Sequence, residues 1–244
     1  MATKGIILAA GRGSRMGSFT AEKPKCLIEF GGRSLLEWQI KAFEKSGITK
    51  VGIVTGYLRE KITETFNLTE FYNEKWNSTN MVASLYQADS WLTESDCIVS
   101  YADIFYKESA IKLLDKSQSR LAITYDPNWR ILWEKRFENP LTDAETFALD
   151  QDGFLIDIGR TPESYETVQG QYMGLLKFTP AVWLVAKKLI KKNANKNISM
   201  TELLQKLVML KEKIQGIEYC DIWGEVDSVK DLQLYENSLK HVFP

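Results

Sequence analysis

The feature that most constrains the fold is a short apolar segment that runs directly into a glycine-rich, basic loop. Residues 5–10 have the composition of a fully buried parallel strand, and Gly11 and Gly13 follow it. Glycines let backbone N–H groups approach a phosphate or the edge of a base. The loop also carries four basic side chains, Arg12, Arg15, Lys23 and Lys25. This combination suits a triphosphate, although an ordinary glycine-rich surface turn shares its local features.

Strand-like and helix-like segments alternate through the first half of the chain. Predicted strands cover 5–9, 51–55, 97–101 and 121–125, and predicted helices cover 35–43, 58–66 and a segment from Asn80 to Leu92. This order predicts an α/β fold with a doubly wound, mostly parallel mixed sheet, Rossmann-like in architecture. We expect one domain, 1–244, with a first half at about 1–126 and a second half at 127–244.

The second half begins with a mixed α+β insertion. Short extended segments at 146–149 and 154–158 are separated by polar turns, and helices return at 180–192 and 199–210. Ser199 and Glu202 form the sequence signature of a capping box at the start of the last of these helices. We expect the insertion to carry the residues that determine which substrate the protein accepts.

Charge and composition exclude several classes of partner. The 31 basic and 32 acidic residues leave a formal net charge of −1, which gives no electrostatic footprint for nucleic acid or an anionic membrane surface. No apolar run approaches the length of a membrane-spanning helix, and three widely spaced cysteines fit a reducing compartment. We therefore expect a cytoplasmic protein. The sequence leaves a homodimer possible.

The spacing of the first loop also excludes two familiar phosphate-binding motifs. A dinucleotide fingerprint would place a glycine at Met16, and no Gly-Lys-Ser/Thr triplet of a Walker A loop occurs. Instead, residues 8–17 and the later Pro24-Lys25 pair follow the pattern LxAGxGxRM…PK. This pattern resembles that of the sugar-nucleotide-type nucleotidyltransferases, and the chain as a whole is most similar to their phosphocholine cytidylyltransferase-like branch.

The resemblance implies a nucleotide-binding half at about 1–126 and an acceptor-binding, metal-completing half at 127–244. It also implies which residues bind the nucleotide and the metal. Lys25 and Arg15 would be catalytic, and Asp103 and Asp227 would hold Mg²⁺, which prefers carboxylate oxygens and phosphates. The nucleotide-binding set would be Leu8, Ala9, Ala10, Gly11, Arg12, Gly13, Ser14, Lys25, Gly56, Tyr57, Asn80, Ser84, Ala102 and Asp103. Taken alone, Asp103 could simply end a strand, and Asp227 could be only the N-cap of a following helix.

The acceptor pocket is expected to take its side chains from two segments of the second half. The predicted residues are Trp129, Arg130, Trp133, Arg136, Glu145, Gln171 and Tyr172. Trp129 and Trp133 could stack on a quaternary ammonium, or could pack inside the insertion instead. Arg130 and Arg136 would meet a phosphate or carboxylate, and Glu138 or Glu145 an amine.

These features predict an Mg²⁺-dependent nucleotidyltransferase. The expected reaction transfers CMP from CTP to a small phosphorylated amino compound, phosphocholine-like or phospho-amino-acid-like, and releases pyrophosphate. The product would serve surface-polysaccharide or phospholipid-type precursor synthesis. One alternative is a sugar-1-phosphate nucleotidyltransferase that uses GTP, UTP or dTTP. The alternative of another class is a non-catalytic nucleotide-binding regulatory subunit.

Overall fold

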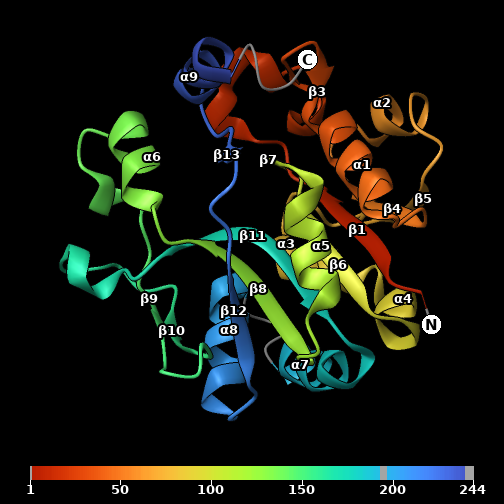
Figure 1. Ribbon diagram of the computed structural model, residues 1–244. Helices are drawn as coiled ribbons and strands as arrows, with labels where there is room; N and C mark the ends of the chain where they lie inside the picture. The colour runs from red at the N-terminus through yellow and green to blue at the C-terminus, as the bar shows by residue number, and fades with distance from the viewer. Residues whose placement is uncertain (1, 193–196, 240–244) are drawn as a thin grey trace.

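A seven-stranded sheet forms the centre of the protein (Figure 1), whose computed structural model describes residues 2–192 and 197–239. The strands lie in the order β12, β8, β11, β6, β1, β4, β5. Their bounds are Ile214–Glu218, Leu121–Asp126, Gln171–Phe178, Cys97–Tyr101, Lys4–Ala9, Val51–Thr55 and Thr69–Tyr72, in the same order. Strands from both predicted halves of the chain therefore share one sheet.

All strands of this sheet run parallel except β11. β1 pairs in parallel with β4 and β6, β4 with β5, and β8 with β12, whereas β11 pairs antiparallel with both β6 and β8. The carboxyl ends of β1 and β6 therefore lie at the same edge, where open α/β sheets bind their ligands. The predicted mostly parallel, mixed α/β fold is confirmed.

Helices cover both faces of the sheet (Figure 1). One face packs against α3 (Met81–Tyr86), α4 (Asp89–Glu94), α7 (Pro180–Lys192) and α8 (Met200–Met209). The other packs against α1 (Leu35–Ser46), α2 (Arg59–Thr63), α5 (Glu108–Lys116) and α6 (Trp129–Arg136). Ile6 and Leu8 of β1 point to the first layer and Ile7 and Ala9 to the second, as the two-residue repeat of a strand requires. None of the helices within 2–192 and 197–239 is long and apolar enough to cross a membrane.

Three two-stranded ribbons extend this core. They are β2 (Glu29–Phe30) with β3 (Arg33–Ser34), β7 (Ile104–Tyr106) with β13 (Trp223–Glu225), and β9 (Phe147–Leu149) with β10 (Leu155–Ile158). Short 3₁₀ helices complete the chain at Ser14–Thr20, Lys25–Leu27, Pro140–Thr142 and Tyr165–Thr167. A separate apolar cluster, with Met16, Phe105 and Tyr235 among its members, packs helix α9 (Val229–Leu239) against the first two ribbons.

Three expectations about local structure need correction. The helix expected from Asn80 to Leu92 is two helices, because the chain leaves helical geometry between Tyr86 and Asp89. The helix expected at 58–66 is confined to Arg59–Thr63 and starts after Leu58, which has a φ of 45°. The largest omission is β11, a long central strand in a stretch for which no strand was predicted.

Candidate active site

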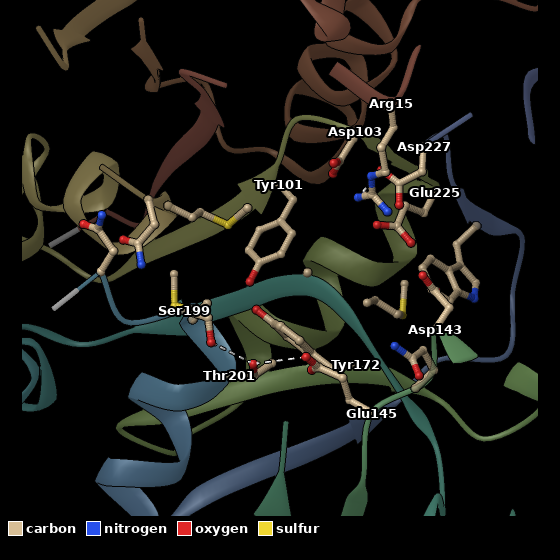
Figure 2. A pocket seen from close by; sticks show the side chains of 18 residues that line it. Arg15, Tyr101, Asp103, Asp143, Glu145, Tyr172, Ser199, Thr201, Glu225 and Asp227 are labelled. Carbon is tan, nitrogen blue, oxygen red and sulfur yellow. Dashed lines mark hydrogen bonds and ion pairs between the residues drawn. The ribbon is translucent and has the colours of Figure 1, made fainter. Parts of the chain in front are cut away.

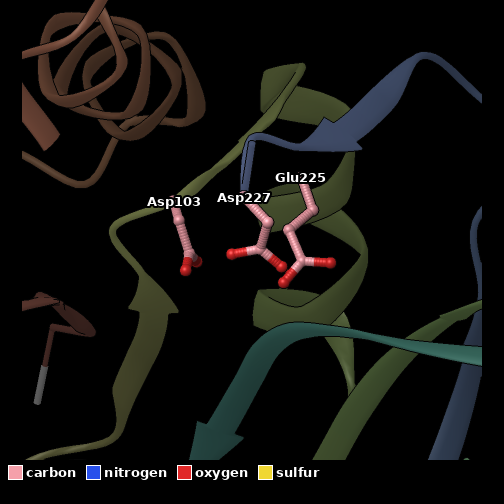
Figure 3. Close-up of side chains that lie close together, drawn as sticks. All are labelled: Asp103, Glu225 and Asp227. Atoms are coloured by element: carbon pink, nitrogen blue, oxygen red, sulfur yellow. The ribbon is translucent and has the colours of Figure 1, made fainter. Parts of the chain in front are cut away.

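The antiparallel pairing of β7 with β13 brings together two acidic segments that are far apart in the sequence. Glu225 is the register partner of Ile104, and the backbone N–H of Val226 donates to the carbonyl oxygen of Asp103 at 2.9 Å. Asp103 lies in the turn after β6, and Asp227 follows β13. As Figure 3 shows, the carboxylates of Asp103, Glu225 and Asp227 point toward a common region.

Lys25 lies between two of these carboxylates. Its Nζ atom is 3.0 Å from Oδ2 of Asp103 and 2.5 Å from Oδ1 of Asp227, and the lysine side chain is almost completely buried. Arg15 reaches the same Asp227 oxygen at 2.9 Å, but its side chain is largely exposed. The lysine of the first loop and the two distant aspartates therefore converge at one place.

Gly13 makes room for the stem of Lys25. A Cβ atom at Gly13 would lie 2.7 Å from Cδ of Lys25, and the backbone of Gly13 has a φ of +70° that favours glycine. Pro24 precedes the 3₁₀ turn at Lys25–Leu27, and its φ of −59° fixes how the lysine enters the site. The second glycine of the loop is thus required by the position of the lysine.

A buried polar network holds the turn that carries Asp103. The side-chain amide of Gln39 in α1 donates to the carbonyl oxygens of Tyr101 at 2.8 Å and Ile104 at 2.6 Å, on both sides of the turn. The amide oxygen of Gln39 accepts from the Ser100 hydroxyl at 3.0 Å. Because all of these polar groups are paired inside the protein, the turn is fixed rather than free to rearrange.

Mutual electrostatics hold Lys25 and Asp227 in their charged states. Burial alone would lower the pKa of Lys25, but the charges of Asp103 and Asp227 raise it above its ordinary value. Burial would raise the pKa of Asp227, yet Lys25 and Arg15 hold it below the usual range. Glu225 differs, since burial and the nearby charges of Asp227 and Asp103 raise its pKa to about 8.

Helix α9 is capped by residues other than Asp227. Oδ2 of Asp231 accepts from the backbone N–H and the hydroxyl of Ser228, and the Ser228 hydroxyl accepts from the N–H of Asp231. This reciprocal pair is a capping arrangement at Ser228. The possibility that Asp227 serves only as an N-cap is therefore wrong, and its carboxylate is directed into the site.

Two cavities meet at this cluster. A cavity of about 240 Å³ lies over the first loop, and a larger one of about 520 Å³ lies beside it (Figure 2); both are lined by Arg15, Met81 and Asp103. Of the predicted nucleotide-binding residues, Leu8, Ala9, Gly11, Gly13, Ser14, Lys25, Ala102 and Asp103 line the smaller cavity. Asn80 lines the larger cavity and caps helix α3.

The other predicted nucleotide-binding residues do not line either cavity. The carbonyl oxygen of Ala10 accepts from the N–H of Tyr57, and a Cβ atom at Gly56 would collide with that carbonyl. The guanidinium of Arg12 lies over the Tyr57 ring, 5.6 Å from its centroid. Ser84 is buried and bonds to Asn73. The structure gives Ala10, Arg12, Gly56 and Tyr57 a role in shaping the loop, whereas Ser84 belongs to a buried hydrogen-bond network around Asn73.

Four of the predicted acceptor residues lie outside the larger cavity, which corrects the prediction. Trp129 and Trp133 are buried in the core under α6, with their indole N–H groups donating to Val168 and Asp143. Arg130 is on the surface and pairs with Glu134 at 2.6 Å. Their spacing of four residues places Trp129 and Trp133 on one face of α6, and that face packs against the core.

Arg136 is the fourth of these residues, and it supports the acidic cluster from behind. Its guanidinium is fully buried, with Nε 2.8 Å from Asp231 and one terminal nitrogen 3.1 Å from Glu225. The other terminal nitrogen is 3.7 Å from Asp227. With its donors committed to these carboxylates, Arg136 cannot bind an acceptor, and it compensates the negative charge of the cluster instead.

The remaining predictions fall on the larger cavity. Glu145, Gln171 and Tyr172 line it, whereas Glu138 is exposed elsewhere. Sequence reasoning missed Glu225 and Asp143, which also line it. A signal was available for Glu225, because it lies two residues before Asp227 at the end of an extended segment, where alternate side chains share one side. Asp143 ends a 3₁₀ turn, and no such pattern marks it.

The acidic cluster fits a divalent cation. One oxygen from each of Asp103, Glu225 and Asp227 lies within 4.8 Å of the others. Oδ1 of Asp103 is buried and has no hydrogen-bond partner within the described part of the chain. Carboxylate oxygens at this spacing are the donors that Mg²⁺ takes in proteins.

The chain is similar to several known nucleotidyltransferases. Residues 5–141 match the family described as the MobA-like NTP transferase domain. CTP:phosphoglutamine cytidylyltransferase of Campylobacter jejuni is 33% identical over 247 residues, covering 94% of this chain and 97% of that protein. Choline-phosphate cytidylyltransferase of Streptococcus pneumoniae is 35% identical over 95 residues, covering 38% of this chain and 42% of that protein. In fold alone, the inositol-1-phosphate CTP transferase from T. maritima is similar at 19% identity, with a TM-score of 0.77 over 99% and 97% of the two chains.

The raised pKa of Glu225 predicts a pH-dependent stability of the metal-free protein. Between its ordinary value of 4.5 and about 8, folded Glu225 keeps a proton that the unfolded chain loses. The free energy of unfolding should therefore fall as pH rises through this window and level off above it. We expect urea unfolding in the presence of a chelator to show this decline, and Glu225→Gln to reduce it between pH 6 and 8. An equally steep decline in that variant would contradict the assignment.

Proposed function

We propose a cytidylyl transfer reaction for this chain, which belongs to the MobA-like NTP transferase domain family. CMP passes from CTP to a small phosphorylated amino compound, and pyrophosphate is released. The nucleotidyltransferase class predicted from the first loop is confirmed by the family match, which covers more than half of the chain. The choice of nucleotide and acceptor is the proposal.

The observation that carries the proposal is the position of Lys25 where the two cavities meet. Its Nζ lies between Asp103 and Asp227, at the end of the glycine loop and beside the larger cavity. A triphosphate in the smaller cavity and a phosphorylated acceptor in the larger one would present their reacting phosphates to this lysine.

The reaction requires positioning and charge neutralisation. An oxygen of the acceptor phosphate attacks the α-phosphorus of CTP; the new O–P bond forms as the bond to the pyrophosphate oxygen breaks, and pyrophosphate leaves with that electron pair. The attacking phosphate is already ionised at neutral pH, so no general base is needed. Lys25 neutralises charge on the α-phosphate. Arg15, whose largely exposed side chain pairs with Asp227, would turn to the β- and γ-phosphates.

We propose that the enzyme depends on Mg²⁺. Asp103 and Asp227 would hold the ion, and Glu225 is close enough to add a third ligand. Bound there, Mg²⁺ would supply positive charge beside the phosphates of both substrates. Arg136 and Asp231 keep these carboxylates in place from the protein side. The proposal includes a cytoplasmic location and a role in making surface-polysaccharide or phospholipid-type precursors.

CTP is favoured over other nucleotides because a relative that matches 94% of the chain and one that matches 38% of it are both cytidylyltransferases. A panel of CTP, GTP, UTP and dTTP with Mg²⁺ tests this choice, using phosphorylated amino compounds and sugar 1-phosphates as acceptors. We expect pyrophosphate release with CTP and an amino compound only. Release with a sugar 1-phosphate and another nucleotide would favour a sugar-nucleotide enzyme. Binding without release from any pair would favour a regulatory subunit.

Substitution of Lys25 tests its role. Lys25→Ala should lower turnover by about 10²–10³-fold, the usual effect of removing a donor to developing charge. Lys177→Ala is the matched control, since Lys177 is also buried and paired, with Asp96 at 3.2 Å, but lies at the other end of β6. The control should lose stability and retain turnover in a pyrophosphate-release assay. Near wild-type turnover of folded Lys25→Ala would remove Lys25 from the mechanism.

A further inference from the structure

We propose that Asp143 and Glu145 form a subsite for a primary ammonium group of the acceptor. This inference rests on the proposed function and names the group that the larger cavity selects. Figure 2 shows Glu145, Tyr172 and Thr201 at the far end of this cavity, away from Asp103 and Arg15. An acceptor whose phosphate reaches the acidic cluster would place its other end among these side chains.

Two acidic side chains line this side of the cavity, with Glu145 at its far end and Asp143 nearer to Glu225 (Figure 2). Among the described residues that line the cavity, the one basic side chain is Arg15, which is paired with Asp227. Neither Asp143 nor Glu145 forms an ion pair within the described residues. Burial raises the pKa of Asp143, although the charge of Arg136 acts in the opposite direction. Burial also raises the pKa of Glu145, and the charge of Asp143 raises it further. A bound cation would relieve this unfavourable arrangement.

The two carboxylates are held in place by neutral donors. The indole N–H of the buried Trp133 donates to Oδ2 of Asp143 at 3.1 Å. The Thr201 hydroxyl, at the start of α8, donates to Oε1 of Glu145 at 3.4 Å. Each partner fixes one oxygen, so both carboxylates are oriented without being neutralised.

A further acceptor atom completes the subsite. The side-chain oxygen of Gln171, also on the cavity wall, is shielded from solvent and has no hydrogen-bond partner within the described residues. A buried acceptor of this kind is costly until a donor reaches it. Two carboxylates and one amide oxygen match the three N–H groups of a primary ammonium.

A quaternary ammonium is the competing ligand. It has no N–H groups, would leave Gln171 unpaired, and would depend on aromatic faces. The rings of Tyr101, Tyr172 and Trp223 line the cavity, but Trp129 and Trp133, the pair expected to form a cage, are buried in the core. The unpaired acceptors therefore favour the primary ammonium.

A methylation series tests the subsite. The acceptors are phosphoethanolamine, its mono- and dimethyl derivatives and phosphocholine, with ethyl phosphate as the uncharged analogue, each assayed with CTP and Mg²⁺ for pyrophosphate release. We expect kcat/KM to fall with each methyl group, by about 10- to 100-fold over the series, as lost charged hydrogen bonds imply. Equal or better turnover of phosphocholine would overturn the proposal.

Variants separate the subsite from general damage. Glu145→Gln and Asp143→Asn should each raise the KM for phosphoethanolamine by about 10-fold or more, leave the KM for CTP unchanged and flatten the methylation series. Glu138→Gln, an exposed change in the same segment, should behave as wild type. Equal rates for ethyl phosphate and phosphoethanolamine would overturn the subsite and leave cytidylyl transfer standing. No release from CTP with any acceptor would overturn the proposed function, and with it the subsite.

Discussion

The pairing of β7 with β13 is the constraint on which the rest of the site depends. It joins the turn after β6 to a segment near the end of the chain, so Asp103, Glu225 and Asp227 approach one another through backbone hydrogen bonds. The apolar cluster beneath α9 packs against this ribbon and holds it to the first loop. Carboxylates that would repel one another in a flexible chain are therefore fixed side by side.

The charge of this cluster is balanced from two sides. Arg136 pairs with Glu225 from within the core, and Lys25 pairs with Asp103 and Asp227 from the cavity side. In the proposed reaction, Asp103 and Asp227 would hold a cation, whose positive charge would replace that of Lys25 beside them. Lys25 would then be available to the α-phosphate. The same lysine would thus stabilise the nucleotide-free protein and neutralise charge on the transferred group.

Much of the fold and the centre of the site could be predicted from the sequence, because strand composition and the spacing of the first loop are local signals. Lys25 lies in that loop, whereas Asp103 and Asp227 were predicted only through the family resemblance, since local pattern alone makes them the end of a strand and the N-cap of a helix. Strand β11 does not follow from local signals, since Gly174, with a φ of +83°, interrupts its alternation and its partners are distant in sequence. The burial of Arg136 could not be predicted either. Helical spacing shows which residues share one face of a helix, but it does not show what packs against that face.

The most direct test of the convergence around Lys25 is a crystal structure with Mn²⁺ in place of Mg²⁺ and a CTP analogue whose α,β-bridging oxygen is a methylene group. We expect an anomalous Mn²⁺ peak within about 2–2.5 Å of oxygens from Asp103 and Asp227. We also expect the α-phosphate within hydrogen-bond distance of Lys25 Nζ. An Mn²⁺ ion bound elsewhere, or a triphosphate that does not reach Lys25, would contradict the convergence of these groups on one nucleotide.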